Sequence, residues 1–243
     1  MSETEPIHQA LREQRQPLRF DIFTLFPEML AGPFDASILK RAAAAGLIEI
    51  QIHQIRDWTH DRHRTVDDRP YGGGAGMIMM APPITEAVES VLGSDLASAR
   101  TLIMSPSGIR FTQDMASSLA GAQRIAIVCG HYEGFDERIS SILLAEEVSI
   151  GDYVLTGGEI PAMVIIDAVA RLAPGVISVQ SIAEESHDKG LVEHPQYTRP
   201  VEFRGLTVPE VLLSGHHQQV REWRRAAAIA KQAKRDEKES GHS

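Results

Sequence analysis

The segment SIGDYVLTGGEIP, residues 149–161, connects a short apolar run to a longer one. The first run ends at Ile150, as a buried strand would, and Pro161 stands where the first turn of a helix tolerates proline. Three glycines lie between, and glycine lets the backbone pass close to a ligand and adopt positive φ. The segment therefore predicts a loop that folds over a flat, partly apolar ligand. Because short glycine motifs are unspecific, a strand-to-helix turn with a tight packing contact is the alternative.

Outward from this segment, apolar runs typical of strands alternate with segments typical of helices, which predicts an α/β sheet with helices on its faces. We expect strands at residues 18–26, 47–55, 101–104, 125–129 and 147–150, and helices at 35–45, 82–92, 112–120, 139–145 and 160–172. Loops rich in glycine and proline follow the strands near residues 105, 130 and 151, and the first of them, residues 105–108, is predicted to be a turn. Since ligands collect at the carboxyl ends of strands in such sheets, we expect these three loops to form one pocket.

The composition excludes several classes of protein. It is that of a globular protein, 43% hydrophobic and 23% charged, and no apolar run approaches the roughly 18 residues that a membrane span needs. Cys129 is the only cysteine and lies in an apolar run, so we expect a core residue, no disulfide within the chain and a reducing, cytoplasmic location. Residues 1–17 lack the apolar core of a signal peptide and are predicted to be a disordered extension.

The formal net charge of −9 argues against binding of polyanions by the whole surface. Residues 221–238, however, carry seven basic and three acidic side chains. This local basic segment is compatible with a nucleic-acid partner, and a solvated helix is the alternative.

Residues 56–80 interrupt the alternation with a long loop dense in Arg, Asp and His, and then in Gly. Long loops in compact domains are usually functional or disordered, and the aromatic and apolar content favours order. His60 and His63 have no cysteine or third histidine nearby, so we expect hydrogen-bonded or RNA-facing histidines and no metal. The glycines match neither the dinucleotide fingerprint nor the phosphate-binding P-loop.

The character of the chain changes after Pro174. Residues 176–200 are polar and irregular, and are predicted to be a linker that orders on contact with a partner or substrate. Residues 201–243 are predicted to form a small helical domain, with helices from Val208 to Gly215 and from His216 to Asp236. The expected organisation is thus an extension (1–17), a first domain (18–175), a linker (176–200) and a helical domain (201–243).

Several segments together resemble one family, the bacterial tRNA (guanine-N1)-methyltransferases of the TrmD type, in the SPOUT class. The matching segments are 59–80, SPSG at 105–108, 129–138, 149–166, 190–200, 211–216 and Trp223-Arg224. Each glycine motif alone is weak, but the set, in order and spanning roughly residues 18–225, is specific. The resemblance implies a deep trefoil knot in the catalytic domain, where composition and periodicity alone predict an unknotted doubly wound sheet. It also implies a homodimer whose active site uses both subunits, and a C-terminal domain that binds tRNA.

The implied reaction is methylation of guanine N1 in tRNA, at the guanosine 3′ of the anticodon (tRNA position 37), with S-adenosylmethionine as methyl donor. Arg171 matches the family's cofactor-binding arginine, and Glu185 aligns with its catalytic carboxylate, which is usually Asp. Because Glu is one methylene longer, either Glu184 or Glu185 is the candidate base. Positions that match the family's cofactor pocket are Pro106, Gly130, Tyr132, Glu133, Ile150, Gly151, Asp152, Tyr153, Val154, Leu155, Gly157 and Gly158.

The chemistry agrees with these roles. The neutral base has no lone pair at N1, so a carboxylate that accepts the N1 proton is needed, and a cation such as Arg171 would stabilise the charge that builds on O6.

Two other functions stay open from the sequence. One is another SPOUT methyltransferase that modifies a ribose or a different base of RNA, and the other is a non-catalytic nucleotide- or RNA-binding module. The helical domain also ends soon after Trp223, short of the family's typical length.

Overall fold

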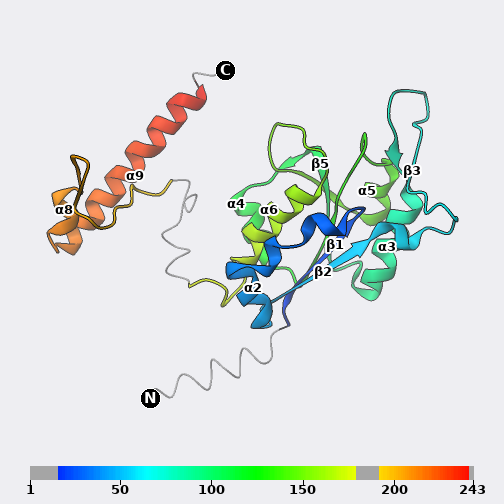
Figure 1. Ribbon diagram of the computed structural model, residues 1–243, viewed down its shortest axis with the longest axis horizontal. Coiled ribbons are helices and arrows are strands. Elements are labelled where there is room, and N and C mark those ends of the chain that lie inside the picture. The colour runs from blue at the N-terminus through cyan, green and yellow to red at the C-terminus, as the bar shows by residue number, and fades with distance from the viewer. Residues whose placement is uncertain (1–15, 179–191, 241–243) are drawn as a thin grey trace, which may run out of the picture. The chain divides into compact units, whose positions relative to one another are not determined.

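The computed structural model describes residues 16–178 and 192–240 (Figure 1). By its contacts the chain divides into two compact units, residues 1–177 and 178–243. The predicted extension lies almost wholly outside the described residues, and so does the middle of the predicted linker. The finer division into four parts therefore stays a prediction.

Within residues 16–178, five strands form one sheet in the order β2-β1-β6-β5-β7, and every neighbouring pair is parallel. The strands are β1 (Leu18–Thr24), β2 (Ile48–Gln54), β5 (Arg100–Arg110), β6 (Arg124–Val128) and β7 (Glu146–Ser149). The sheet confirms the predicted mostly parallel α/β class. The trefoil knot stays a prediction.

Helices cover both faces of this sheet (Figure 1). They are α2 (Ser37–Ala44), α3 (Ala81–Leu92), α4 (Gln113–Ala120), α5 (Arg138–Leu143) and α6 (Glu159–Ala170), with short 3-10 helices η1 (Pro27–Leu30), η2 (Pro33–Asp35), η3 (Ile55–Trp58) and η4 (Gly93–Asp95). One hydrophobic cluster joins α2, α4 and α6 to the sheet, and a second joins α3 and α5 to its other face. The predicted helices are confirmed to within a few residues at their ends.

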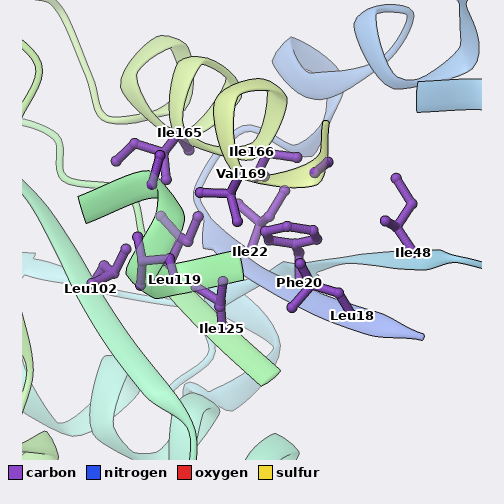
Figure 2. Packing of buried hydrophobic residues seen from close by; sticks show 14 of the residues in the cluster. Leu18, Phe20, Ile22, Ile48, Leu102, Leu119, Ile125, Ile165, Ile166 and Val169 are labelled. Carbon is purple, nitrogen blue, oxygen red and sulfur yellow. The ribbon is translucent and has the colours of Figure 1, made fainter. Parts of the chain in front are cut away.

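Helix α6 is anchored by apolar packing. Figure 2 shows Phe20 and Ile22 of β1 facing Ile165, Ile166 and Val169 of α6, and all five side chains are fully buried. Burial of a side chain of this size stabilises a fold by about 1.5–3 kcal/mol. The contacts fix the position of α6 on the sheet, and with it the position of the loop that precedes the helix.

The prediction of a turn at residues 105–108 is wrong in one respect. Strand β5 runs through it, and its pairing with β7 shifts register, because both Met104 and Ile109 pair with Val148. The residues between them bulge out of the ladder. Gly108 lies so close to β7 that an added Cβ would be 2.4 Å from the main chain of Glu147, so only glycine fits there.

The long loop contains a two-stranded hairpin of β3 (Asp67–Asp68) and β4 (Ile78–Met79). In the second unit, β8 (Glu202–Phe203) and β9 (Leu206–Thr207) pair as another hairpin before α8 (Glu210–Leu213) and α9 (His217–Ser240). The predicted helices are present, but the expectation of an all-helical unit is wrong because of this hairpin. Within the described residues, no helix combines the length and the apolar character needed to cross a bilayer.

A buried carboxylate ties three strands of the sheet together. Asp21 of β1 is fully buried, and its oxygens lie 2.7 Å from Arg124 Nε, 3.1 Å from Arg19 Nε and 2.8 Å from His53 Nε2. Burial alone raises a carboxyl pKa, but the hydrogen bonds from His53, Arg124 and Arg19 hold the pKa of Asp21 well below its usual range. The ionised form therefore stabilises the folded state.

We expect Asp21→Asn to lower the free energy of unfolding by about 3 kcal/mol, because it leaves buried cations without their counter-charge. Since the folded pKa of Asp21 lies below the unfolded value of about 4, the stabilisation is full above that value and is lost as the pH falls through the folded pKa. Urea unfolding at pH 7 and pH 3 measures both effects, and the difference between wild type and variant should shrink at pH 3. The control is Asp57→Asn, which breaks an exposed pair with Arg64 and should change stability by less than about 0.5 kcal/mol. Equal losses in both variants would contradict the prediction.

Candidate active site

One cleft of about 590 Å³ opens beside the bulge of β5 and the carboxyl ends of β6 and β7. The β5 bulge, the loop after β6 and the loop between β7 and α6 line it, so the structure confirms that the three predicted loops share one pocket. Eleven of the twelve residues expected to bind a cofactor lie in its wall. They are Pro106, Gly130, Tyr132, Glu133, Ile150, Gly151, Tyr153, Val154, Leu155, Gly157 and Gly158.

Asp152 is the exception among these twelve residues. Its side chain is largely exposed and lies 3.4 Å from Arg110 Nη1, at the end of β5. The loop places the neighbours of Asp152 in the wall of the cleft and turns this carboxylate toward the arginine. Asp152 therefore does not line the cleft, and its assignment as a cofactor-binding residue stays a prediction.

The glycines of the cleft let its loops touch one another. A Cβ at Gly158 would lie 2.7 Å from Cys129 Cα and Gly130 N, and the Gly158 amide donates to the Gly130 carbonyl at 2.9 Å. A Cβ at Gly130 would lie 2.7 Å from the ring of Phe135. The tight packing contact expected as the alternative for the glycine-rich segment is thus present, and it brings together the loops that line the cleft, whereas the folding of this segment over a ligand stays a prediction.

The long loop supplies a further support. Residues Met77–Met79 pair with the loop after β6, through bonds from the Glu133 amide to the Met77 carbonyl (3.0 Å) and from the Met79 amide to the Gly134 carbonyl (2.9 Å). Gly76 has a φ of +83°, and an added Cβ would overlap the Glu133 side chain. Gly76 and the main chain of residues 77–79 therefore help to hold the wall of the cleft.

Two side chains in this region have shifted pKa values, Asp136 in the wall of the cleft and Cys129 in the core next to Gly130. The hydrogen bond from Arg138 lowers the pKa of Asp136, so this carboxylate is ionised. Burial, and after it the charge of Glu159, raise the pKa of the Cys129 thiol well above its usual range. Cys129 is thus a neutral core residue rather than a nucleophile.

Comparison with known proteins agrees with this geometry. The family model described as tRNA (Guanine-1)-methyltransferase TrmD matches residues 18–238, which is most of the chain. This chain belongs to the TrmD family. Proteins named tRNA (guanine-N(1)-)-methyltransferase are similar to it along most of their length. The one from Thermomicrobium roseum is 63% identical over 218 residues (90% of this chain, 81% of that protein), and the one from Chloroflexus aggregans is 56% identical over 212 residues (87% and 83%). That of Dehalococcoides mccartyi strain 195 is 52% identical over 219 residues (90% and 88%).

Of the two catalytic candidates of this TrmD-family chain, the structure describes only Arg171. Arg171 is the C-cap of α6, whereas Gly158, in the wall of the cleft, is its N-cap. At about 1.5 Å per residue the helix separates these two positions by roughly 20 Å, so one chain does not bring Arg171 to its own cleft. Glu185, like Glu184, falls outside the described residues.

Sequence reasoning missed several residues that line the cleft, among them Ser105, Ser107, Phe135 and Thr156. Each stands within two positions of a predicted residue, and an adjacent glycine was the available signal for Ser107, Phe135 and Thr156. For metal, the described residues contain no group of three or more His, Cys, Asp or Glu side chains with suitable geometry. His60 Nε2 lies 2.7 Å from Glu86 Oε2, so this histidine is hydrogen-bonded, which is one of the two arrangements expected for it from the sequence.

The second unit of this TrmD-family chain holds a groove of about 340 Å³ lined by residues 194–199 and by parts of α8 and α9. The Trp223 ring of α9 packs beside it, with centroids 6.4 Å from the His194 ring and 6.3 Å from the Tyr197 ring. Arg199 and Arg224 also line the groove. Aromatic rings beside guanidinium groups can stack bases and pair with phosphates.

Proposed function

We propose that this chain methylates N1 of guanine in tRNA, at the guanosine 3′ of the anticodon (tRNA position 37), with S-adenosylmethionine as methyl donor. The observation that carries the proposal is the cleft that the β5 bulge and the loops after β6 and β7 form together in a member of the TrmD family. The printed names of the similar proteins support the same reaction.

The cleft suits an adenosylmethionine-sized ligand. Its volume of about 590 Å³ lies in the range of about 300–1,000 Å³ typical of small-molecule sites. The main chain of Gly130, Gly151 and Gly157 would present hydrogen-bonding groups to the adenine, and Tyr153 and Leu155 supply apolar surface. When bound, S-adenosylmethionine supplies a methyl group on a positively charged sulfur, so no metal or nucleophilic side chain is needed.

The chain's own contribution to chemistry is the removal of a proton. A carboxylate within hydrogen-bonding reach of N1 accepts the proton that the neutral base carries there. Glu185 is our proposed base, and Glu184 is the alternative. The linker position of both residues would let the carboxylate approach a base held at the cleft.

We propose further that the active site is shared by two copies of the chain. Arg171 lies roughly 20 Å along α6 from the cleft of its own chain, so Arg171 of the partner subunit would have to reach that cleft. Exposed apolar side chains support a protein contact nearby, since Val154 stands in the loop before α6, and Ile160 and Val164 on the exposed side of the helix. Sedimentation of the purified chain tests the dimer.

We expect Arg171→Ala to lower kcat/KM for tRNA methylation roughly 30-fold, about 2 kcal/mol of transition-state stabilisation, because the charge on guanine O6 loses its counter-ion. Steady-state kinetics measures the loss, and Arg171→Lys should recover part of it. Near-wild-type kinetics for the alanine variant would remove Arg171 from the mechanism.

The proposed binding of tRNA uses the second unit. Its groove combines aromatic rings with Arg199 and Arg224, and α9 carries the basic segment seen in the sequence. An unstacked loop nucleotide is the form in which RNA-modifying enzymes reach a base, since extrusion from a duplex costs a few kcal/mol more.

The deciding experiment incubates the chain with S-adenosylmethionine labelled in the methyl group and with total tRNA, and then maps the labelled nucleoside. We expect 1-methylguanosine at position 37. Label in a ribose or in another base would show a different SPOUT methyltransferase. Absence of label together with absence of S-adenosylmethionine binding would show a non-catalytic module.

A further inference from the structure

A fully buried carboxylate lies behind the cleft, on a residue that the proposed mechanism does not use. Glu159 begins α6 and has no exposed surface. Its Oε1 accepts a hydrogen bond of 2.5 Å from Thr24 Oγ1 at the end of β1, and its Oε2 lies 2.8 Å from His131 Nε2. Thr24 Oγ1 in turn accepts from the Phe26 amide at 2.9 Å. The carboxylate therefore connects the ends of β1 and β6 with the start of α6.

A carboxylate in this position stays buried only if its partners stay in place, because an unpaired charge in the interior costs several kcal/mol. The start of α6 adds support, since the positive end of a helix dipole stabilises a negative charge in the first turn. Loss of either partner would leave the charge unsatisfied. The network consequently holds Thr24 and His131 at fixed positions.

His131 carries this constraint to the cleft. It lines the cleft between Gly130 and Tyr132, and its ring packs against Phe26 with centroids 4.6 Å apart. A Cβ at Gly157 would lie 2.4 Å from His131 Cε1 and 2.6 Å from Glu159 Oε2. The imidazole and the carboxylate thus occupy the space beside Gly157, and the two main loops of the cleft meet at this point.

We propose that Glu159 and His131 are positioning residues that hold these two loops in the arrangement that binds the methyl donor. Glu159 has no exposed surface and acts through His131, whose side chain is 13% exposed. The inference rests on the proposed function for the identity of the ligand. Its direct consequence is for binding of S-adenosylmethionine rather than for recognition of tRNA.

The hydrogen-bond geometry defines the variants. In the proposed arrangement His131 Nε2 carries the proton and donates to the Glu159 carboxylate. His131→Ala removes this donor. His131→Gln places an amide N–H near the position of Nε2 and keeps the bond to Glu159. Glu159→Gln preserves shape, but it removes the charge that holds the histidine proton at Nε2.

The chain offers a matched control in His53. Its Nε2 lies 2.8 Å from the buried Asp21, the same distance as in the His131–Glu159 pair, and its side chain is 17% exposed. His53 does not line the cleft. His53→Ala thus removes an equivalent histidine–carboxylate bond elsewhere on the sheet.

Calorimetric titration of each full-length variant with S-adenosylmethionine tests the inference, with thermal unfolding as a check of folding. We expect His131→Ala and Glu159→Gln to weaken binding about tenfold, as loss of a hydrogen bond to a charged group does. His131→Gln should bind within about twofold of wild type, and His53→Ala should bind like wild type. Wild-type affinity in His131→Ala, or equal weakening in His53→Ala, would overturn the proposal.

A second readout follows the proton itself. In 15N-histidine spectra of the wild-type chain we expect His131 to carry its proton on Nε2, and we expect Glu159→Gln to change that pattern. An unprotonated Nε2 in the wild type would overturn the proposed donor role.

Neither readout needs tRNA. A chain that binds S-adenosylmethionine through this network but does not methylate tRNA would refute the proposed function alone, and methylation that is indifferent to His131 would refute this inference alone.

Discussion

Glu185→Gln is expected to lower the rate of guanine methylation by about 10²- to 10⁴-fold, the usual contribution of a positioned general base. The amide keeps the size of the side chain but cannot accept the N1 proton, and the neutral base then offers no lone pair to the methyl group. Affinity for S-adenosylmethionine should stay at the wild-type level, because the cleft is built from other segments. Single-turnover methylation of tRNA and calorimetric titration measure the two quantities separately.

The control for this prediction is the neighbouring residue. Glu184→Gln makes the same chemical change one position earlier in the linker and should leave the rate within a few-fold of wild type. A large loss in Glu184→Gln with little loss in Glu185→Gln would assign the base to Glu184. If both variants turn over like wild type, the linker carboxylate has no part in the reaction.

The sheet was predictable because its signals are local. The continuous apolar run at 125–129 became β6, and the loops at the ends of β6 and β7 met in one cleft, as parallel topology requires. The β8–β9 hairpin also had a local signal that we overlooked. Arg204 and Gly205 between the strands both have positive φ, and a two-residue loop ending in glycine is typical of a tight hairpin.

Other features depend on partners that are distant in sequence. Pro106 and Gly108 are typical of a turn, and the β5 bulge arises only because Gly108 packs on the main chain of β7. Glu159 stands in the first turn of α6, and its partners lie 135 and 28 positions away along the chain, so the sequence pattern does not indicate them. Periodicity also cannot tell which side chain of a loop turns outward, so nothing in the sequence indicated that the Asp152 carboxylate lies beside Arg110 and not in the wall of the cleft.

Gly158→Ala is expected to lower kcat/KM by at least about 100-fold and the free energy of unfolding by about 1–3 kcal/mol. The new methyl group would lie 2.7 Å from Cys129 Cα and from Gly130 N, both of which belong to the main chain and cannot rotate away. The loop after β6 and the start of α6 must then separate, which breaks the bond between the Gly158 amide and the Gly130 carbonyl. A displacement of about 1 Å at a binding site is enough to cost a factor of about 100.

Titration with S-adenosylmethionine should show that most of this loss is in binding of the methyl donor, since Gly130 and Gly158 both lie in the wall of the cleft. The control is Gly121→Ala at the C-cap of α4, where φ is −81° and the nearest contact of an added Cβ is 3.3 Å, so activity should be unchanged. If Gly158→Ala binds the donor as wild type does, the close contact between the two loops does not shape the binding site. A loss of donor binding would show that position 158 needs glycine so that the two loops can approach each other. The clash of an added methyl group is with protein main chain, which cannot move aside as a side chain can.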